Sequence, residues 1–294
     1  MPATIISGKE ISARIRERIK GEIDEMVRQN RINPAFVMPG LAVILVGDDP
    51  GSAIYVRNKR KICEEVGIRS FGYILDRNTS EAELMAIIDQ LNKDRNVHGI
   101  LCQMPLPPHL DEFSVISAIS PEKDVDGFHP INKGLLSMGK DCMIPCTPLG
   151  CVEMIKQSGI EITGKHCVII GRSNIVGKPL AALMLNENAT VTITHSKTRN
   201  LKEICKQADI LVAAIGKTGF VTGEYIKEGA VVIDVGINRD ADNKVRGDVL
   251  FEEAVEIAGA ITPVPGGVGL MTTTLLMQNT LQAYRNIISK EAVL

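Results

Sequence analysis

Residues 166–179 contain the residue types that hold a dinucleotide pyrophosphate. A short apolar run stops at Gly171, and after a loop Gly177 opens an apolar stretch, which predicts a strand, a glycine turn and a helix. Glycine lets the backbone approach a ligand closely, and free N–H groups at the start of a helix face an anion. The spacing departs from GxGxxG, because Ser173 stands at the second glycine position and Gly177 falls one residue late. By itself this segment fits either a dinucleotide site or a plain strand–helix turn.

The next predicted strand, 189–194, ends in a polar and basic tip. In folds that prefer NAD, an acidic residue near this point accepts hydrogen bonds from the ribose hydroxyls. Here His195, Ser196 and Lys197 follow the strand, and Arg172 lies in the glycine loop. A guanidinium with hydroxyl and basic groups suits a 2′-phosphate dianion, so we predict NADP rather than NAD as the cofactor. The alternative is a solvated basic turn.

Candidate catalytic residues lie in the N-terminal half. Tyr55 and Lys59 share one face of a predicted helix, where a tyrosine ring can stack on a heterocycle and a lysine in a partly apolar cleft can transfer protons. Gln103 directly follows a predicted strand, and its amide can hold a lysine ammonium together with a substrate carbonyl. Asp126 lies in the loop beyond and can pair with an amidine-like ring edge. The alternative for Tyr55 and Lys59 is a surface pair without a catalytic role. The alternative for Asp126 is a carboxylate that caps a turn.

The segment 263–269, PVPGGVG, is a further candidate. Two prolines and three glycines stand directly before a predicted helix. Such a loop either lets a ligand approach the backbone or simply connects two elements. The stiffening by Pro-Val-Pro favours the ligand-binding interpretation, because a flexible connector does not need it.

The elements that position these residues are predicted as two αβα units. The first begins with an amphipathic helix over 5–29, with Ser7 as its N-cap. Its strands are predicted at 41–46, 71–75 and 97–102, and its helices at 52–66, 81–92 and 112–119. The stretch 121–148 is predicted to be irregular, and a helix over 147–157 has Thr147 as its N-cap.

The second unit follows with strands at 167–170, 190–194, 210–213 and 231–235, a short candidate strand at 260–261 and a final helix over about 269–289. Alternating strands and helices predict parallel sheets covered by helices. The predicted fold class is therefore α/β, with two αβα domains around a cleft. The second domain is predicted to be a Rossmann-like NADP-binding domain.

Composition excludes several functional classes. The chain has 294 residues, 45% hydrophobic and 23% charged, with a net charge of −2 and only 3% aromatic residues. These values predict a globular protein that binds neither nucleic acid nor a membrane. The N-terminus lacks the apolar core of a secretory signal, so we expect a cytoplasmic protein with free thiols. The cluster Cys142, Cys146 and Cys151 has no CxxC pair or nearby histidine, so we expect no metal.

Several separated segments, in order along almost the whole chain, resemble the bifunctional methylenetetrahydrofolate dehydrogenase/cyclohydrolase family of one-carbon metabolism. The matching segments are 52–59 (SAIYVRNK), 103–107 (QMPLP), 121–127 (PEKDVDG), 145–148 (PCTP), 171–179 (GRSNIVGKP), 195–198 (HSKT), 234–238 (DVGIN) and 263–272. One departure is Leu270, which stands where the family is expected to have proline. Leucine keeps the helix there but is expected to leave the exit of the loop less rigid.

The resemblance implies oxidation of 5,10-methylenetetrahydrofolate with NADP, followed by hydrolysis to 10-formyltetrahydrofolate in the same cleft. It implies that Lys59 is the catalytic lysine, Tyr55 stacks on the pterin, Gln103 partners Lys59 and Asp126 holds the amino edge of the pterin. The implied folate-binding loop consists of Pro265, Gly266, Gly267 and Val268. The implied cofactor-binding residues are Thr147, Gly171, Arg172, Ser173, Val176, His195, Ser196 and Ile237.

The resemblance also suggests a homodimer. We expect a catalytic domain over 1–146, completed by a C-terminal helix over about 272–294, and an NADP-binding domain over 147–271. Two other functions fit parts of the sequence. One is an oxidoreductase similar to shikimate dehydrogenase, which leaves the PVPGGVG segment unexplained. The other is a nonenzymatic NADP-binding regulator, which gives Tyr55, Lys59 and Gln103 no task.

Overall fold

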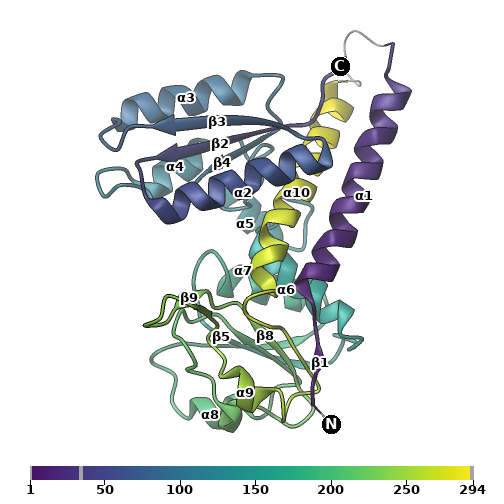
Figure 1. Ribbon diagram of the computed structural model, residues 1–294, viewed down its shortest axis with the longest axis vertical. Helices are drawn as coiled ribbons and strands as arrows, with labels where there is room; N and C mark the ends of the chain where they lie inside the picture. The colour runs from purple at the N-terminus through teal and green to yellow at the C-terminus, as the bar shows by residue number, and fades with distance from the viewer. Residues whose placement is uncertain (1, 33–35, 292–294) are drawn as a thin grey trace. The chain divides into compact units, whose positions relative to one another are not determined.

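The computed structural model describes residues 2–32 and 36–291. The chain divides into two compact units (Figure 1). Among the described residues, the three-stranded unit comprises those of 14–135, 141–144 and 273–291, and the six-stranded unit comprises 2–13, 136–140 and 145–272. Residues 2–13, 136–140 and 145–146, which the prediction places in the first domain, group with the six-stranded unit. Residues 1 and 292–294 of the predicted domain ranges lie outside the described residues.

The three-stranded unit is built on a parallel sheet in the order β3-β2-β4. Its strands are β2 (Gly40–Val46), β3 (Arg69–Leu75) and β4 (Gly99–Cys102). Its helices α2 (Pro50–Val66) and α3 (Glu81–Lys93) lie on opposite sides of the sheet in Figure 1, and α4 (Glu112–Ala118) packs with α3. Successive side chains of β2 alternate between the two faces, so Ala42, Ile44 and Val46 share one core with the buried residues of α3.

Local signals in the sequence determine where the helices of this unit begin and end. The Asp49 carboxylate accepts a hydrogen bond from the Ser52 N–H at 2.7 Å and caps α2. Gly67 ends α2 in the left-handed conformation. Ser80 and Glu83 form a reciprocal capping box at the start of α3. These caps hold the helices at the sheet edge where the catalytic candidates lie.

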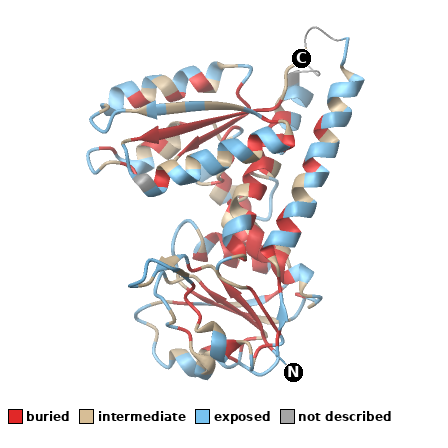
Figure 2. Cartoon of the chain, in the orientation of Figure 1, coloured by how far each residue is buried: buried red, intermediate tan, exposed pale blue. Residues whose placement is uncertain are grey.

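The six-stranded unit has the parallel order β1-β11-β8-β7-β5-β6. Its strands are β1 (Thr4–Ile5), β5 (His166–Ile170), β6 (Thr190–Thr194), β7 (Ile210–Ala213), β8 (Val231–Asp234) and β11 (Ala260–Ile261). Its other elements are α6 (Cys146–Gln157), α7 (Gly177–Asn186), α8 (Leu201–Cys205), η1 (Gly223–Tyr225), α9 (Phe251–Ala254) and a hairpin of β9 (Asn238–Arg239) and β10 (Val245–Arg246). The central strands β5, β7 and β8 are buried except for His166 at the start of β5 (Figure 2). The strand order reverses between β5 and β7, which in open α/β sheets is the position of the ligand crevice.

Two long helices, α1 (Gly8–Gln29) and α10 (Val268–Glu291), complete the fold together with α5 (Pro130–Ser137). Within the three-stranded unit, α1 and α10 are joined by Arg285 with Glu22 at 2.6 Å and by Arg18 with Gln278 at 2.6 Å. No described helix combines the length and the apolar character needed to cross a membrane.

The predicted α/β class, the parallel sheets and the strand positions are confirmed, whereas three local predictions are wrong. The first helix begins at Gly8, because Ile5 belongs to β1 and pairs with Ile261 of β11. The stretch predicted to be irregular contains α5, whose first residue is Pro130 and whose apolar pattern is interrupted by Gly134. Thr147 does not cap α6, since that helix begins one residue earlier and has no side-chain cap.

Candidate active and cofactor sites

Lys59 and Gln103 meet at the carboxyl edge of the three-stranded sheet. β2 leads into α2, which carries Lys59, and β4 leads directly to Gln103, so the pair lies where the strand order reverses. The Lys59 Nζ donates a hydrogen bond to Gln103 Oε1 at 2.6 Å. Gln103 Nε2 donates to the Met104 carbonyl at 2.8 Å, which fixes the orientation of the amide. The structure thus brings together the lysine and the amide that the sequence analysis paired.

Tyr55 lies one helical turn before Lys59 on α2, as their spacing predicts. Its side chain is 48% exposed, whereas Lys59 and Gln103 are half-buried. The ring therefore has free surface on which a flat heterocycle can stack, close to the ammonium group.

Asp126 is supported by a loop that continues the sheet beyond β4. The Ile100 N–H donates to the Lys123 carbonyl at 2.7 Å, and Ile100 forms a parallel bridge with Asp124. Burial raises the pKa of Asp126 to about 6, although the positive charge of Lys59 acts in the opposite direction. Among the described residues none donates a hydrogen bond to this carboxylate, so its acceptor capacity is available to a ligand.

The turn-capping carboxylate of this loop is Asp124, a residue that the sequence analysis did not select. Asp124 is buried and accepts hydrogen bonds from the N–H groups of Phe128 at 3.2 Å and His129 at 2.8 Å. It also accepts one from Asn132 Nδ2 at 2.8 Å. The capping role considered for Asp126 is therefore performed by Asp124, two residues earlier.

Lys123 is a second residue that the sequence analysis missed in this loop. Its side chain is buried and donates to the carbonyl groups of Leu91 at 3.0 Å and Asp94 at 2.8 Å, at the end of α3. A lysine at the C-terminal end of a helix satisfies carbonyl groups that lack partners within the helix. Lys123 thus attaches the loop that carries Asp126 to the rest of the unit.

The glycine turn after β5 in the six-stranded unit is closely packed. Gly171 has a φ of +130°, and a Cβ there would lie 2.2 Å from the Ala214 carbonyl oxygen. A Cβ on Gly177 would lie 2.1 Å from the Gly171 carbonyl oxygen, so both positions require glycine. Ser173 Oγ accepts hydrogen bonds from the Val176 N–H at 3.1 Å and the Gly177 N–H at 3.3 Å. These two N–H groups are therefore satisfied within the protein.

The two segments predicted to recognise a 2′-phosphate follow the carboxyl ends of the neighbouring strands β5 and β6. Ile170 of β5 is in register with Thr194 of β6, and the Gly171 N–H donates to the Thr194 carbonyl at 3.0 Å. Arg172 and Ser196 follow these strands and are both exposed. The tip after β6 is an ordered turn, since the His195 N–H donates to Thr198 Oγ1 at 2.8 Å and the Lys197 N–H donates to His195 Nδ1 at 3.2 Å.

Ile237 follows β8, and its side chain is 52% exposed. The loop that carries it is held by buried Asp234, which accepts hydrogen bonds from the Gly236 N–H at 2.9 Å and the Val249 N–H at 3.0 Å. Burial raises the pKa of Asp234 to about 6, while these N–H groups act in the opposite direction. Thr147 lies near the start of α6, with its Oγ1 3.0 Å from Thr272 Oγ1. These supporting contacts are not evident from the sequence.

The PVPGGVG loop is supported by the N-terminal segment of the chain, which the sequence analysis did not anticipate. A Cβ on Gly8 would lie 2.2 Å from the Gly267 carbonyl oxygen, and the Lys9 N–H donates to the Gly266 carbonyl at 3.2 Å. Pro265 is exposed, whereas Gly267 and Val268 are buried. The Leu270 N–H donates to the Gly267 carbonyl at 3.2 Å. A proline at this position lacks that donor, so leucine fixes the exit of the loop by a different contact.

The predicted site residues thus form two groups, one in each unit. Tyr55, Lys59, Gln103 and Asp126 belong to the three-stranded unit, and the predicted cofactor-binding residues and the PVPGGVG loop belong to the six-stranded unit. All seven cysteines are free thiols. Within the described part of the chain, no group of three or more metal-ligating side chains comes together.

The fold and these two groups define a two-unit α/β protein with parallel sheets and a glycine turn of the dinucleotide-binding type. Residues 6–126 match the model of the tetrahydrofolate dehydrogenase/cyclohydrolase catalytic domain. Residues 145–288 match the model of the tetrahydrofolate dehydrogenase/cyclohydrolase NAD(P)-binding domain. The chain therefore belongs to the tetrahydrofolate dehydrogenase/cyclohydrolase family.

Individual relatives agree with this assignment. The bifunctional protein FolD of Acetivibrio thermocellus is 56% identical over 96% of this chain and 97% of its own length. The crystal structure of the bifunctional enzyme FolD from Campylobacter jejuni has a TM-score of 0.93 at 45% identity, covering 97% of this chain and 99% of that chain. The FolD structure from Trypanosoma brucei, complexed with NADP cofactor and inhibitor, has a TM-score of 0.92 at 38% identity, covering 98% and 99%.

Proposed function

We propose that this protein oxidises 5,10-methylenetetrahydrofolate with NADP and hydrolyses the resulting 5,10-methenyltetrahydrofolate to 10-formyltetrahydrofolate. The observation that carries the proposal is the contact between Lys59 and Gln103 at the carboxyl edge of a sheet, in a chain of this family. The catalytic-domain match ends at residue 126, so it covers all four residues of the catalytic group. The proteins from Campylobacter jejuni and Trypanosoma brucei carry both activities, methylenetetrahydrofolate dehydrogenase and cyclohydrolase, in their names.

The two steps make different demands on the residues. NADP, when bound, accepts the hydride that leaves the methylene carbon between N5 and N10. Oxidation gives the methenyl cation directly, so the protein must position the folate rather than supply a base. Hydrolysis then adds water to the amidinium carbon and opens one carbon–nitrogen bond, which requires proton transfers. Lys59, oriented by Gln103, is the group proposed to perform them.

The remaining residues are proposed to bind the substrates. Tyr55 stacks on the pterin, and Asp126 accepts hydrogen bonds from its amino edge. The loop of Pro265, Gly266, Gly267 and Val268 contacts the folate. The NADP site is formed by Thr147, Gly171, Arg172, Ser173, Val176, His195, Ser196 and Ile237, which the dinucleotide-type turn and the shared edge of β5 and β6 support.

A direct assay tests the function. Purified protein is mixed with methylenetetrahydrofolate and NADP, and the absorbance of the reduced cofactor is followed together with that of the methenyl product. Reduction of NADP that depends on the folate supports the proposal. Reduction with shikimate but not with folate would favour the shikimate-dehydrogenase alternative, and NADP binding without turnover of either compound would favour a regulator.

Cofactor choice gives a prediction for Arg172. We expect Arg172→Ala to weaken NADP binding by about 1.5–3 kcal/mol, the range for a hydrogen bond to a charged group, and to leave NAD binding nearly unchanged. Isothermal titration with each cofactor measures the difference. The control is Lys206→Ala, which removes an exposed cation at the C-cap of α8 in the same unit. Equal losses for both cofactors would mean that Arg172 shapes the loop instead of recognising the phosphate.

A homodimer is the proposed assembly, and β3 is the surface that supports it. This strand is at the edge of its sheet, with β2 as its only neighbour among the described strands. Phe71, Tyr73 and Leu75 pack against the core, whereas Ile74 is 77% exposed. An exposed, partly apolar edge strand favours pairing with a second chain.

We therefore expect Ile74→Asp to convert the dimer into a monomer, because the substitution places a charge within the proposed interface. Size-exclusion chromatography with light scattering measures the mass. The control is Ile32→Asp, since Ile32 is 95% exposed and lies outside any strand. A monomeric wild-type protein, or an unchanged mass for the Ile74 variant, would contradict the proposal.

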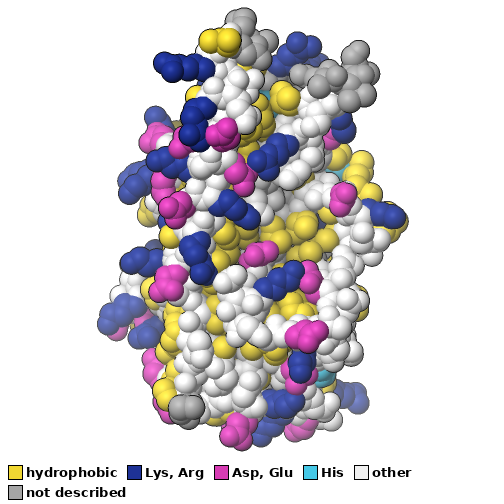
Figure 3. Space-filling model, turned by 90° about the vertical axis from the view of Figure 1, so that its right-hand side faces the viewer, with side chains coloured by type: hydrophobic (Ala, Val, Ile, Leu, Met, Phe, Trp, Pro, Cys, Tyr) yellow, Lys and Arg dark blue, Asp and Glu magenta, His cyan; other side chains and the backbone are white. Residues whose placement is uncertain are grey.

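We also propose that the protein acts in the cytoplasm on small molecules, without binding nucleic acid or a membrane. The net charge of −2 and the mixture of basic and acidic side chains on the face drawn in Figure 3 support this proposal.

A further inference from the structure

Asp248 holds together two loops at the carboxyl edge of the six-stranded sheet. Its side chain is fully buried and accepts hydrogen bonds from three consecutive N–H groups, those of Ile215 at 2.6 Å, Gly216 at 2.9 Å and Lys217 at 2.8 Å. It also accepts a hydrogen bond from Asn238 Nδ2 at 2.9 Å. These four bonds satisfy a charge that would otherwise be costly to bury.

Both loops belong to the region where a ligand of this sheet is expected. Residues 215–217 follow β7, one of the two strands between which the strand order reverses. The preceding residue, Ala214, packs against the glycine turn, since a Cβ on Gly171 would lie 2.2 Å from its carbonyl oxygen. Asn238 directly follows Ile237, which is exposed after β8. A shift of the Asp248 carboxylate would therefore move the backbone after both β7 and β8, on one side of the crevice.

Consecutive N–H groups in a turn form a concavity that binds anions. Here the protein's own carboxylate occupies that concavity, so these N–H groups are not available to a phosphate of the dinucleotide. This arrangement indicates that residues 215–217 contribute the shape of the crevice, while the recognition of phosphate belongs to other residues.

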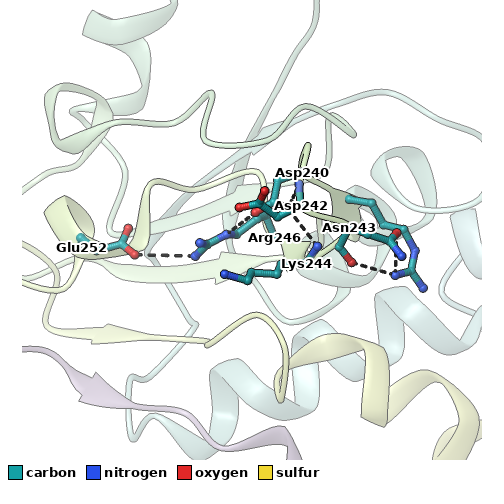
Figure 4. A network of polar contacts seen from close by, with 7 residues as sticks. Asp240, Asp242, Asn243, Lys244, Arg246 and Glu252 are labelled. Carbon is teal, nitrogen blue, oxygen red and sulfur yellow. Dashed lines mark hydrogen bonds and ion pairs between the residues drawn. The ribbon is translucent and has the colours of Figure 1, made fainter.

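The segment that delivers Asp248 is itself fixed in two ways. The Asp248 N–H donates to Asp234 Oδ1 at 2.9 Å. The hairpin of β9 and β10 before it is closed by polar contacts, in which Asp240 accepts from Arg246 Nε at 3.1 Å and Arg246 Nη1 lies 3.9 Å from Glu252 Oε1 (Figure 4). The bond to Asp234 and the polar contacts of the hairpin therefore fix the position of Asp248.

We propose that Asp248 is a positioning residue for the dinucleotide, which acts by holding residues 215–217 and Asn238 in the shape that binds the cofactor. The inference rests on the proposed function to the extent that NADP is the ligand of this sheet. It assigns no contact between Asp248 and the cofactor.

The test compares Asp248→Asn with wild type by calorimetric titration of NADP without folate, and by the two activities separately. An amide keeps the shape but loses the charge that binds the three N–H groups, so we expect the Kd for NADP to rise about tenfold or more. Cyclohydrolase activity, measured with methenyltetrahydrofolate and no nucleotide, should stay within about twofold, since its proposed catalytic group lies in the other unit.

The matched control is Asp209→Asn at the opposite end of the same strands. Asp209 accepts the His166 N–H at 3.0 Å and pairs with Lys227 at 2.7 Å, at the amino ends of β5 and β7. This variant should lower the melting temperature without changing the Kd for NADP. If both variants weaken NADP equally, or if folded Asp248→Asn binds NADP like wild type, the positioning role is wrong.

A second variant keeps the test decisive if Asp248→Asn does not fold. Asn238→Ala removes only the side-chain bond between the first residue of β9 and Asp248, and it should raise the Kd for NADP about threefold to tenfold. Wild-type affinity in that variant would overturn the proposal.

The failure of the proposed function is separate: a wild-type protein that binds NADP but does not turn over folate refutes the enzyme assignment and leaves the titration valid. A wild-type protein that does not bind NADP refutes both.

Discussion

Replacing Lys59 with methionine should abolish the cyclohydrolase activity, by about two orders of magnitude or more, the scale of general acid–base catalysis. Methionine keeps the length and the apolar stem of the side chain but removes the ammonium that contacts Gln103 Oε1 at 2.6 Å. Hydrolysis needs a group that moves protons, and Lys59 is the residue proposed for it. The decay of methenyltetrahydrofolate absorbance, corrected for the uncatalysed reaction, measures the rate.

The control for this experiment is Lys61→Met on the same helix. The Lys61 side chain is exposed and lies two residues beyond Lys59, on a different face of α2. It should retain wild-type hydrolysis and the wild-type melting temperature. Near-wild-type cyclohydrolase rates in a folded Lys59→Met protein would remove Lys59 from the mechanism.

Asp126→Asn should reduce both folate-dependent activities about a hundredfold or more in kcat/KM, while NADP affinity measured without folate stays intact. The proposed partner of the carboxylate is the amino edge of the pterin, which carries N–H donors. An amide at this position also presents N–H donors, and two donors cannot pair. Buried hydrogen-bonding groups without partners cost much free energy, so the variant should bind and convert the folate far less well. Steady-state kinetics of both reactions, together with titration of NADP, measure the effect.

The same variant should be more stable than wild type at neutral pH, because the ionised carboxylate is costly to bury. Burial raises the pKa of Asp126 from its ordinary value of 3.8 to about 6 in the folded protein. Between these values the folded state binds more protons than the unfolded state, so the contribution of Asp126 to stability falls as the pH rises from about 4 to 6. Above pH 6 the cost is complete. The stabilisation by Asp126→Asn should therefore be full above pH 6 and disappear below about pH 4.

Thermal melting across this pH range distinguishes a ligand-binding role from a capping role. The control is Asp124→Asn, which places an amide N–H₂ group among donors that now give the carboxylate three hydrogen bonds; the loss of these bonds should lower the melting temperature. A destabilised Asp126→Asn protein whose folded fraction turns over folate normally would count against the proposed role of Asp126.

The sequence by itself determined the elements and the local pairings. Short apolar runs predicted β2, β4 and β5, because the apolar residues of each strand are buried and such a run is recognised without distant information. The spacing of Tyr55 and Lys59 fixed their common face, since the period of a helix is a local property. The order of the separated motifs predicted the family that the domain models confirmed.

The tertiary structure decided which groups satisfy one another. The sequence does not reveal that Ser173 occupies N–H groups at the start of α7, that Asp124 rather than Asp126 caps the loop, or that Asp248 binds the loop after β7. It also does not reveal that Gly8 packs on Gly267. These contacts join segments whose proximity depends on strand order and register, and the residues on each side show no local pattern that identifies the partner. Burial makes the contacts of Asp124 and Asp248 obligatory, because a buried polar group without its partner costs more free energy than the fold can spare.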